Sequence, residues 1–233
     1  MTHTLCNERR DFPEWHQGRS HYAVWALALD TEAVRQRMRL AQQHLSVYLL
    51  DGYQRQPHVT LGLCGFPSTA PVLADDFGVP TLKAQWQALR TSGLQPFDIR
   101  IGGLHSFASV PYLQVDAPAG ALQTLRRCLA TAALNADAGS YLPHLTVGLY
   151  GGVWPLASLQ ALFQRFDAGP WLQLPINHIE LLAYEASQIG GPLHRLARYD
   201  IANGNLHCNT VLPQALQAFA QASLAQFAAT PTA

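Results

Sequence analysis

Two copies of one short motif contain the residue types that could do chemistry in this chain. The segments 57–63 and 143–149 read PHVTLGL and PHLTVGL, so Pro, His, Thr, Gly and Leu recur at matching positions. One His-x-Thr tripeptide arises easily by chance, and a lone strand histidine is more often a satisfied polar residue than a catalyst. Two copies in matched apolar frames favour a shared function. The candidate functional residues are His58, Thr60, His144 and Thr146.

The spacing within each motif places the two polar side chains together. Side chains alternate between the two faces of a β-strand, so His58 and Thr60 point one way while Val59 points the other. The second motif follows the same pattern. If the two halves of the chain are related by a pseudo-twofold axis, both His–Thr pairs line one cleft between them.

Two imidazoles and two hydroxyls in one cleft suit the cleavage of a phosphodiester. With an unperturbed pKa of roughly 6.5, neutral and protonated histidine coexist near pH 7. A neutral imidazole can take a proton from water while a protonated one gives a proton to the departing ribose oxygen, each contributing about 10²–10⁴-fold. The threonine hydroxyls can bind the non-bridging oxygens. We therefore expect no metal and no cofactor, and the acid and base roles of the two histidines stay open.

The composition limits the class of protein and of partner. The chain has 233 residues, 48% of them hydrophobic and 13% charged, which is typical of a globular protein with one large domain or two small lobes. Fifteen basic and fifteen acidic residues give no net charge, which disfavours duplex DNA but allows a small phosphate ester. The longest apolar run, Tyr22–Leu29, is far shorter than the roughly 18 residues of a membrane span. We expect a cytoplasmic protein that binds no membrane, since the four cysteines form no disulfide or zinc spacing.

The elements around the motifs follow a repeated order, which predicts a duplicated bilobed fold. A strand, a helix, a His strand, a helix and two strands are followed by a helix, a His strand, a helix and two strands. We expect an α+β fold with a mainly antiparallel sheet in each lobe, helices on the outside and a central cleft. The predicted strands cover 22–29, 57–67, 97–103, 111–118, 141–152, 176–184 and 193–201, and the predicted helices 31–50, 81–94, 119–135, 155–166 and 212–227. The predicted organisation is an N-terminal extension (1–20), the bilobed domain (21–203) and a C-terminal helical tail (204–233).

The two motifs resemble the H-x-[ST]-x motifs of the 2H phosphoesterase superfamily, here HVTL and HLTV. Members of that superfamily include RNA 2′,3′-cyclic phosphodiesterases, also called 2′-5′ RNA ligases. The resemblance extends over about residues 20–201. It implies that His58 and His144 are the acid–base pair, that Thr60 and Thr146 hold the phosphate, that no metal is used, and that the protein is a monomer.

A few residues near the motifs are secondary candidates for substrate binding. Arg55, three residues before the first motif, could approach a phosphate or be a solvated loop residue. Tyr141 and Tyr150 flank the second motif and could stack on a base or bind a phosphate, although aromatic residues at strand ends more often pack. Cys64 has the strand parity of His58, but a small packed thiol is the simpler interpretation.

The sequence therefore predicts a phosphodiesterase that opens a 2′,3′-cyclic phosphate, on a nucleotide or an RNA end, to a phosphomonoester. The same site could act on a 2′-5′ linkage, because acid and base roles reverse with the direction of reaction. One alternative is a catalytically inactive nucleotide- or RNA-binding module that uses the same cleft. Another is a duplicated structural domain in which the motifs are coincidental.

Overall fold

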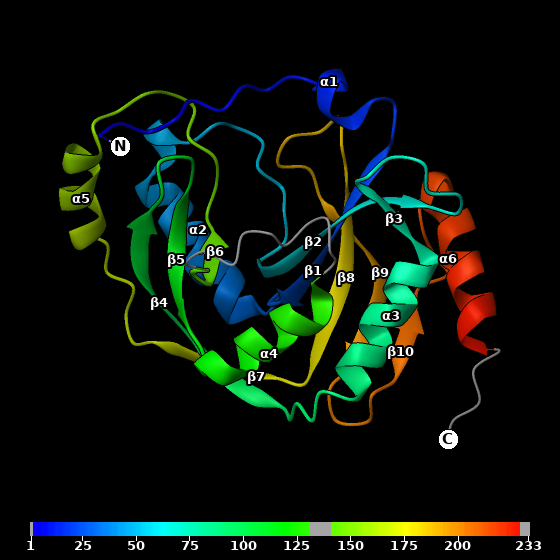
Figure 1. Cartoon of the computed structure of the whole chain (residues 1–233). Helices are drawn as coiled ribbons and strands as arrows, with labels where there is room; N and C mark the ends of the chain where they lie inside the picture. The colour runs from blue at the N-terminus through cyan, green and yellow to red at the C-terminus, as the bar shows by residue number, and fades with distance from the viewer. Residues whose placement is uncertain (1, 131–140, 229–233) are drawn as a thin grey trace.

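The strands of the protein form two sheets, each built from both halves of the sequence. The computed structural model describes residues 2–130 and 141–228 (Figure 1). The larger sheet has the order β10-β9-β8-β1-β2-β3, and every pair in it is antiparallel except β2–β3. Its strands are β1 (His21–Ala28), β2 (His58–Ser68), β3 (Asp76–Gly78), β8 (His178–Glu185), β9 (Leu193–Asp200) and β10 (Leu206–Cys208).

The smaller sheet has the order β6-β5-β4-β7 and is antiparallel throughout. Its strands are β4 (Phe97–Ser106), β5 (Pro111–Asp116), β6 (His144–Thr146) and β7 (Leu172–Ile176). The predicted α+β fold with two mainly antiparallel sheets is confirmed. The sheets exchange strands, however: β4 and β5 belong to the sheet of the second His strand, whereas β8 and β9 join the sheet of the first.

Helices cover the two sheets on their outer sides. Figure 1 shows α3 and α4 next to each other, α6 beside β9 and β10, and α5 on the far side of the smaller sheet. The helices are α1 (Pro13–His16), α2 (Glu32–His44), α3 (Val79–Arg90), α4 (Ala119–Leu129), α5 (Leu156–Gln164) and α6 (Gln214–Ala228), with a short 3₁₀ turn at Ser46–Tyr48. The hydroxyl of Thr31 accepts the N–H of Val34 and caps α2.

Some elements differ from the sequence-based expectation. The helix predicted over 119–135 ends at Leu129, since Ala130 is extended; the predicted part within 131–140 lies outside the described residues. The second His strand is limited to His144–Thr146. Four short elements, α1, β3, β7 and β10, were not predicted, because three to five residues contain too little periodicity to detect.

The core lies between the sheets and the helices, and its buried polar groups are paired. Trp25 of β1 is fully buried, and its indole N–H donates to the Oε1 of Gln85 on α3 (2.9 Å). The Gln85 amide in turn donates to the carbonyl of Leu129 on α4 (2.8 Å). One buried glutamine thus fixes β1, α3 and α4 relative to one another, directly behind the first His strand.

Helix α2 connects the two sheets. Its buried Arg37 donates to the carbonyls of Ile101 (2.8 Å) and Pro170 (2.5 Å), and burial lowers the pKa of this guanidinium. Gln42 of the same helix donates to the carbonyl of Val147, directly after β6 (2.9 Å). These bonds hold the second motif in place relative to the first lobe.

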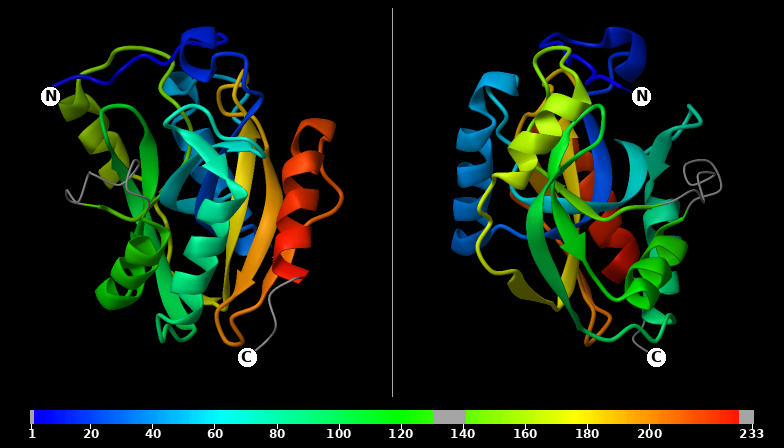
Figure 2. Two further views of the ribbon diagram at one scale, coloured as in Figure 1. Left: turned by 45° about the vertical axis from the view of Figure 1, so that its right-hand side comes forward. Right: turned by 90° about the vertical axis from the view of Figure 1, so that its left-hand side faces the viewer.

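The N-terminal extension runs along one end of both lobes (Figures 1 and 2). Near its start, the backbone N–H of Thr4 donates to the carbonyl of Trp154 (2.8 Å), and that of Asn7 to Tyr150 (2.8 Å). Near its end, Arg19 pairs with Asp75 and Asp76 (2.5 and 3.0 Å). The extension is therefore bonded to both lobes. Within the described residues, no helix is long and apolar enough to cross a bilayer.

Candidate active site

The first motif histidine is held in one orientation by the backbone. His58, at the start of β2, is 8% exposed, and its Nδ1–H donates to the carbonyl of Gln56 (2.8 Å). The side chain of Gln56 is fixed in turn, because its Oε1 accepts the N–H of Leu193 (2.8 Å) and its Nε2 donates to the Leu193 carbonyl (3.2 Å). Since a carbonyl can only accept, the proton lies on Nδ1 and the lone pair of Nε2 is left for chemistry.

The second motif histidine repeats this arrangement. His144, at the start of β6, donates from Nδ1 to the carbonyl of Leu142, also at 2.8 Å and also two residues before the histidine. Its ring packs edge-to-face against Phe107 and Tyr112, with centroid distances of 4.9 and 5.5 Å. The two imidazoles therefore share one tautomer and one backbone setting, but only His144 is partly exposed.

The predicted alternation of side chains is confirmed in both motifs. The aliphatic members, Val59 and Leu61 in one and Leu145 and Val147 in the other, are fully buried in the core. Thr60 and Thr146 lie on the opposite face and are partly exposed. Among the described residues, neither threonine hydroxyl hydrogen-bonds to another protein group, so both are free to bind a ligand.

Tyr141 and Arg126 tie the two motifs together across the lobes. The hydroxyl of Tyr141, three residues before His144, donates to the carbonyl of Thr60 (2.8 Å). The guanidinium of Arg126, on α4, donates to the carbonyl of Leu61 (2.8 Å) and lies 3.9 Å from the centre of the Tyr141 ring. Strands β2 and β6 are in contact, so the two motifs form one site.

Burial gives His58 an unusual ionisation. Desolvation lowers its pKa to about 4; the bond to the Gln56 carbonyl opposes the shift, and the charges of Arg55 and His144 add to it. His58 is therefore neutral at pH 7, with its Nε2 ready to accept a proton.

The secondary candidates lie in different environments. The Arg55 guanidinium lies 3.9 Å from the centre of the Tyr184 ring, close enough to His58 to affect its pKa, and its Nε is buried without a hydrogen-bond partner among the described residues. Tyr150 is fully buried, and its hydroxyl bonds that of Ser106, which agrees with the packing alternative.

Cys64 is buried in the core despite its strand parity with His58. The pairing of β2 with β1 shifts register twice, so that Leu61 and Cys64 lie opposite no residue of β1. These irregularities turn Cys64 away from the face of the motif. Burial also raises the pKa of its thiol.

Gln56, Arg126 and Tyr112 are site residues that sequence reasoning missed. Gln56 acts on His58 through its backbone carbonyl, as Leu142 does on His144. Because the two side chains differ, the sequence shows no repeated residue type at this position. Arg126 and Tyr112 come from α4 and β5, and only the fold brings them to the motifs. Within the part of the chain that the structure describes, no group of three or more His, Cys, Asp or Glu side chains could hold a metal ion.

Comparison with models of known protein families assigns the protein to a superfamily. The family model described as the 2′-5′ RNA ligase superfamily matches residues 26–188, which is more than half of the chain and includes both motifs. The chain belongs to the 2′-5′ RNA ligase superfamily. The first 25 residues, which contain the N-terminal extension, lie outside the match.

Solved structures share the superfamily fold. TT0787 of Thermus thermophilus is 18% identical, with a TM-score of 0.51 over 77% of this chain and 97% of that one. E. coli LigT in complex with 3′-AMP is 16% identical, with a TM-score of 0.53 over 79% of this chain and 99% of LigT. No curated protein matches the sequence. At these identities the similarity shows the fold alone.

Proposed function

We propose that the protein hydrolyses a 2′,3′-cyclic phosphate, on a nucleotide or an RNA end, to a phosphomonoester without a metal. One observation carries this proposal: His58 and His144 both donate from Nδ1 to the carbonyl two residues before them, at 2.8 Å. Each imidazole is thereby oriented and presents Nε2 as the group that can exchange a proton. The superfamily match and the partly exposed hydroxyls of Thr60 and Thr146 support the same chemistry.

We assign the role of base to His58 and that of acid to His144. At neutral pH His58 is uncharged, so its Nε2 can accept a proton from water as the water oxygen attacks phosphorus. His144 is the histidine that solvent reaches, and it gives its proton to the ribose oxygen as the bond from phosphorus to that oxygen breaks. One water is consumed, one P–O bond forms and another breaks, and the two imidazoles have exchanged charge at the end of this step; His58 then releases its proton to solvent and His144 regains one, which restores the starting state.

Thr60 and Thr146 would stabilise the pentavalent phosphorus. Their hydroxyls have no competing bond among the described residues and lie on the same strand faces as the two imidazoles. Hydrogen bonds from such donors strengthen as negative charge builds on the non-bridging oxygens. LigT, which has the same fold, was solved with 3′-AMP, a phosphomonoester of the class that this reaction would produce.

The test is hydrolysis of 2′,3′-cyclic mononucleotides and of a short RNA that ends in a cyclic phosphate. We expect turnover by the wild-type protein that survives EDTA, and a loss of at least about 10²-fold in kcat for His58→Gln and for His144→Gln. Circular dichroism would verify that both variants fold. Chromatography of the product would show whether the 2′- or the 3′-phosphate forms.

Other outcomes would point to other functions. Tight binding of a nucleotide or RNA end without turnover by folded wild-type protein would favour the binding module. Because the superfamily is named for 2′-5′ RNA ligation, a 2′-5′-linked dinucleotide belongs in the same assay. Activity on that linkage alone would assign the same two histidines to a different bond.

A further inference from the structure

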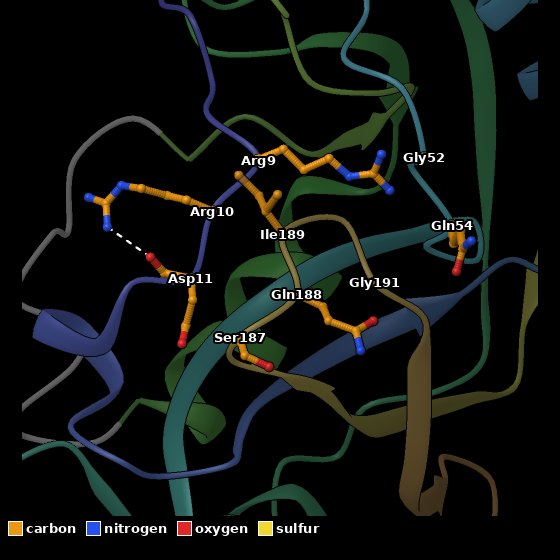
Figure 3. A pocket seen from close by; sticks show the side chains of 9 residues that line it. All are labelled: Arg9, Arg10, Asp11, Gly52, Gln54, Ser187, Gln188, Ile189 and Gly191. Atoms are coloured by element: carbon orange, nitrogen blue, oxygen red, sulfur yellow. Dashed lines mark hydrogen bonds between the residues drawn. The ribbon is translucent and has the colours of Figure 1, made fainter.

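The N-terminal extension forms a polar cavity with the two loops that flank the first motif. The cavity has a volume of about 250 Å³, and its lining includes Arg9, Gln54, Ser187 and Gln188 (Figure 3). These residues come from the extension, from the loop before β2 and from the loop between β8 and β9. The two loops are joined by a bond from the N–H of Gln54 to the carbonyl of Gly190 (2.8 Å).

The two arginines of this cavity are not equivalent. Arg10 pairs with Glu8 and Glu14 and donates to the carbonyl of Asp11, and Figure 3 shows it pointing away from the loops. Arg9 extends across the cavity toward Gly52, and among the described residues it has no hydrogen bond or ion pair. Its guanidinium is therefore an available anion-binding group.

Gly52 makes this position of Arg9 possible. The glycine has a φ of +75°, and a Cβ placed on it would lie 2.3 Å from the Nη2 of Arg9. The guanidinium thus rests directly against the backbone of the loop that leads into the first motif. Gln54, in the same loop, is four residues from His58, so their Cα atoms are at most about 14 Å apart.

A second cavity, of about 280 Å³, adjoins the first one, with which it shares Gln188 and Ile189. Its other lining includes the rings of Phe12, Trp15 and Tyr184. Trp15 is 39% exposed, so part of its face is open. Arg55, three residues before His58, also lines this cavity; its guanidinium lies over the Tyr184 ring, and its Nε lacks a partner among the described residues.

Two acidic groups beside the cavities already accept hydrogen bonds from protein groups. Asp11 accepts a bond from the Nε2 of His16 (2.8 Å). Glu185 accepts bonds from the Ser187 hydroxyl (2.8 Å) and the Gln188 amide (2.6 Å). The groups left to meet a ligand include the Arg9 guanidinium, amides and the open face of Trp15. A guanidinium beside an aromatic platform is a combination that binds single-stranded nucleic acid.

We propose that the N-terminal extension builds a subsite for the nucleotide that precedes the cyclic phosphate of a single-stranded RNA. The base of that nucleotide lies against Trp15, beside the stacked Arg55 and Tyr184, and the phosphodiester that joins it to the terminal nucleotide binds Arg9. This inference rests on the proposed function, because it takes the cyclic phosphate to be bound at His58 and His144. It narrows the substrate class from a nucleotide or an RNA end to an RNA of at least two nucleotides.

The test compares 2′,3′-cyclic AMP with the dinucleotide ApA that ends in a 2′,3′-cyclic phosphate. We expect wild-type protein to have a higher kcat/KM for the dinucleotide than for 2′,3′-cyclic AMP. Arg9→Gln should lower the ratio of kcat/KM for the dinucleotide to kcat/KM for the mononucleotide by about tenfold. Arg10→Gln is the matched control, because it removes the neighbouring arginine, whose guanidinium is already paired with Glu8 and Glu14; its ratio should equal that of wild type. An equal ratio in Arg9→Gln, or no preference by wild type, would overturn the inference.

A binding measurement separates this inference from the proposed function. Fluorescence anisotropy with a labelled oligoadenylate trinucleotide that bears a 3′-phosphate needs no turnover. If wild-type protein hydrolyses neither substrate, the proposed function fails, and a tenfold weaker binding by Arg9→Gln than by Arg10→Gln still supports an RNA subsite at Arg9. If hydrolysis occurs while both variants bind the trinucleotide like wild type, the inference alone fails.

Discussion

The two motif histidines differ in burial although their backbone setting is the same. His58 begins β2, lies opposite Ala28 of β1 and is buried, whereas His144 begins a short strand at the edge of the smaller sheet and is partly exposed. The buried imidazole of His58 loses contact with water, so its pKa falls. The identical sequence frames thus produce two unlike groups, which is what an acid–base pair requires.

The low pKa of His58 predicts how stability changes with pH. An unfolded His58 has a pKa of roughly 6.5 and binds a proton below that pH, whereas the folded one stays neutral down to about pH 4. The unfolded state therefore binds more protons in this window, and stability falls as the pH falls through it. We expect His58 to lower the free energy of unfolding by about 3 kcal/mol between pH 7 and pH 4.

Urea unfolding of the wild type and of His58→Gln at several pH values measures this effect. Glutamine does not titrate, so the variant should lose less stability than wild type over the same interval. Parallel curves for the two proteins would contradict a neutral, buried His58.

At this scale the sequence predicted the motifs but not their surroundings. The polar and apolar alternation of His58, Val59 and Thr60 follows from strand geometry alone. The carbonyl of Gln56 and the approach of Arg126 do not, because the first depends on a backbone bond and the second on a helix that only the fold brings to the motif. Neither leaves a pattern in one sequence.

At the scale of elements, the path of β2 depends on a close approach to the segment before β3. Gly65 has a φ of +117°, and a Cβ placed on it would lie 2.1 Å from the carbonyl oxygen of Asp75. That same carbonyl accepts the N–H of Phe66 (2.9 Å). A side chain at Gly65 would therefore both strain the backbone and push β3 away from β2.

We expect Gly65→Ala to destabilise the protein by at least about 2 kcal/mol, because strain and a steric clash add. Gly93→Ala is the matched control: it also has a positive φ (+68°), but nothing lies within 4 Å of the added Cβ. Gly93→Ala should lower the free energy of unfolding by only about 1 kcal/mol, from conformational strain. Equal unfolding free energies for the two variants, measured in urea, would show that the close approach does not matter.

The elements that sequence analysis missed share one physical cause. Strands β3, β7 and β10 have three to five residues, and the segment of β10, Leu206–Cys208, contains too few side chains to show a period of two. The exchange of strands between the sheets was also invisible, since periodicity reports which face of a strand is buried and not which strand lies beside it.

At the scale of the whole molecule, the N-terminal extension fastens a loop of the second lobe. The hydroxyl of Thr4, which is 2% exposed, donates to the carbonyl of Gly152 (2.9 Å) and accepts the N–H of Trp154 (2.8 Å). Asn7 adds side-chain bonds to the carbonyls of Ser109 and Tyr150 (both 3.1 Å). The loop that follows the second motif is thus held by residues that lie outside the superfamily match.

Thr4→Val should destabilise the protein by about 1–3 kcal/mol, because valine keeps the shape of threonine but leaves both backbone groups unpaired. Hydrogen exchange should quicken at Trp154, whose amide loses its acceptor. Thr2→Val is the control, since the Thr2 side chain is exposed and bonds only the neighbouring His3 among the described residues. An unchanged hydrogen-exchange rate of the Trp154 amide in Thr4→Val would show that the bonds of Thr4 do not stabilise the loop.

The exchange of strands between the sheets has a consequence for folding during translation. Strand β1 ends at Ala28, but β8, which covers one of its edges, begins only at His178. At about 5–20 residues per second on the ribosome, β8 follows β1 by roughly 8 to 30 seconds. Throughout that interval the apolar strand YAVWALA has an open edge, the kind that pairs with other chains. The nascent chain cannot complete its larger sheet until β8 has been translated, so β1 keeps an unpaired edge for most of its synthesis.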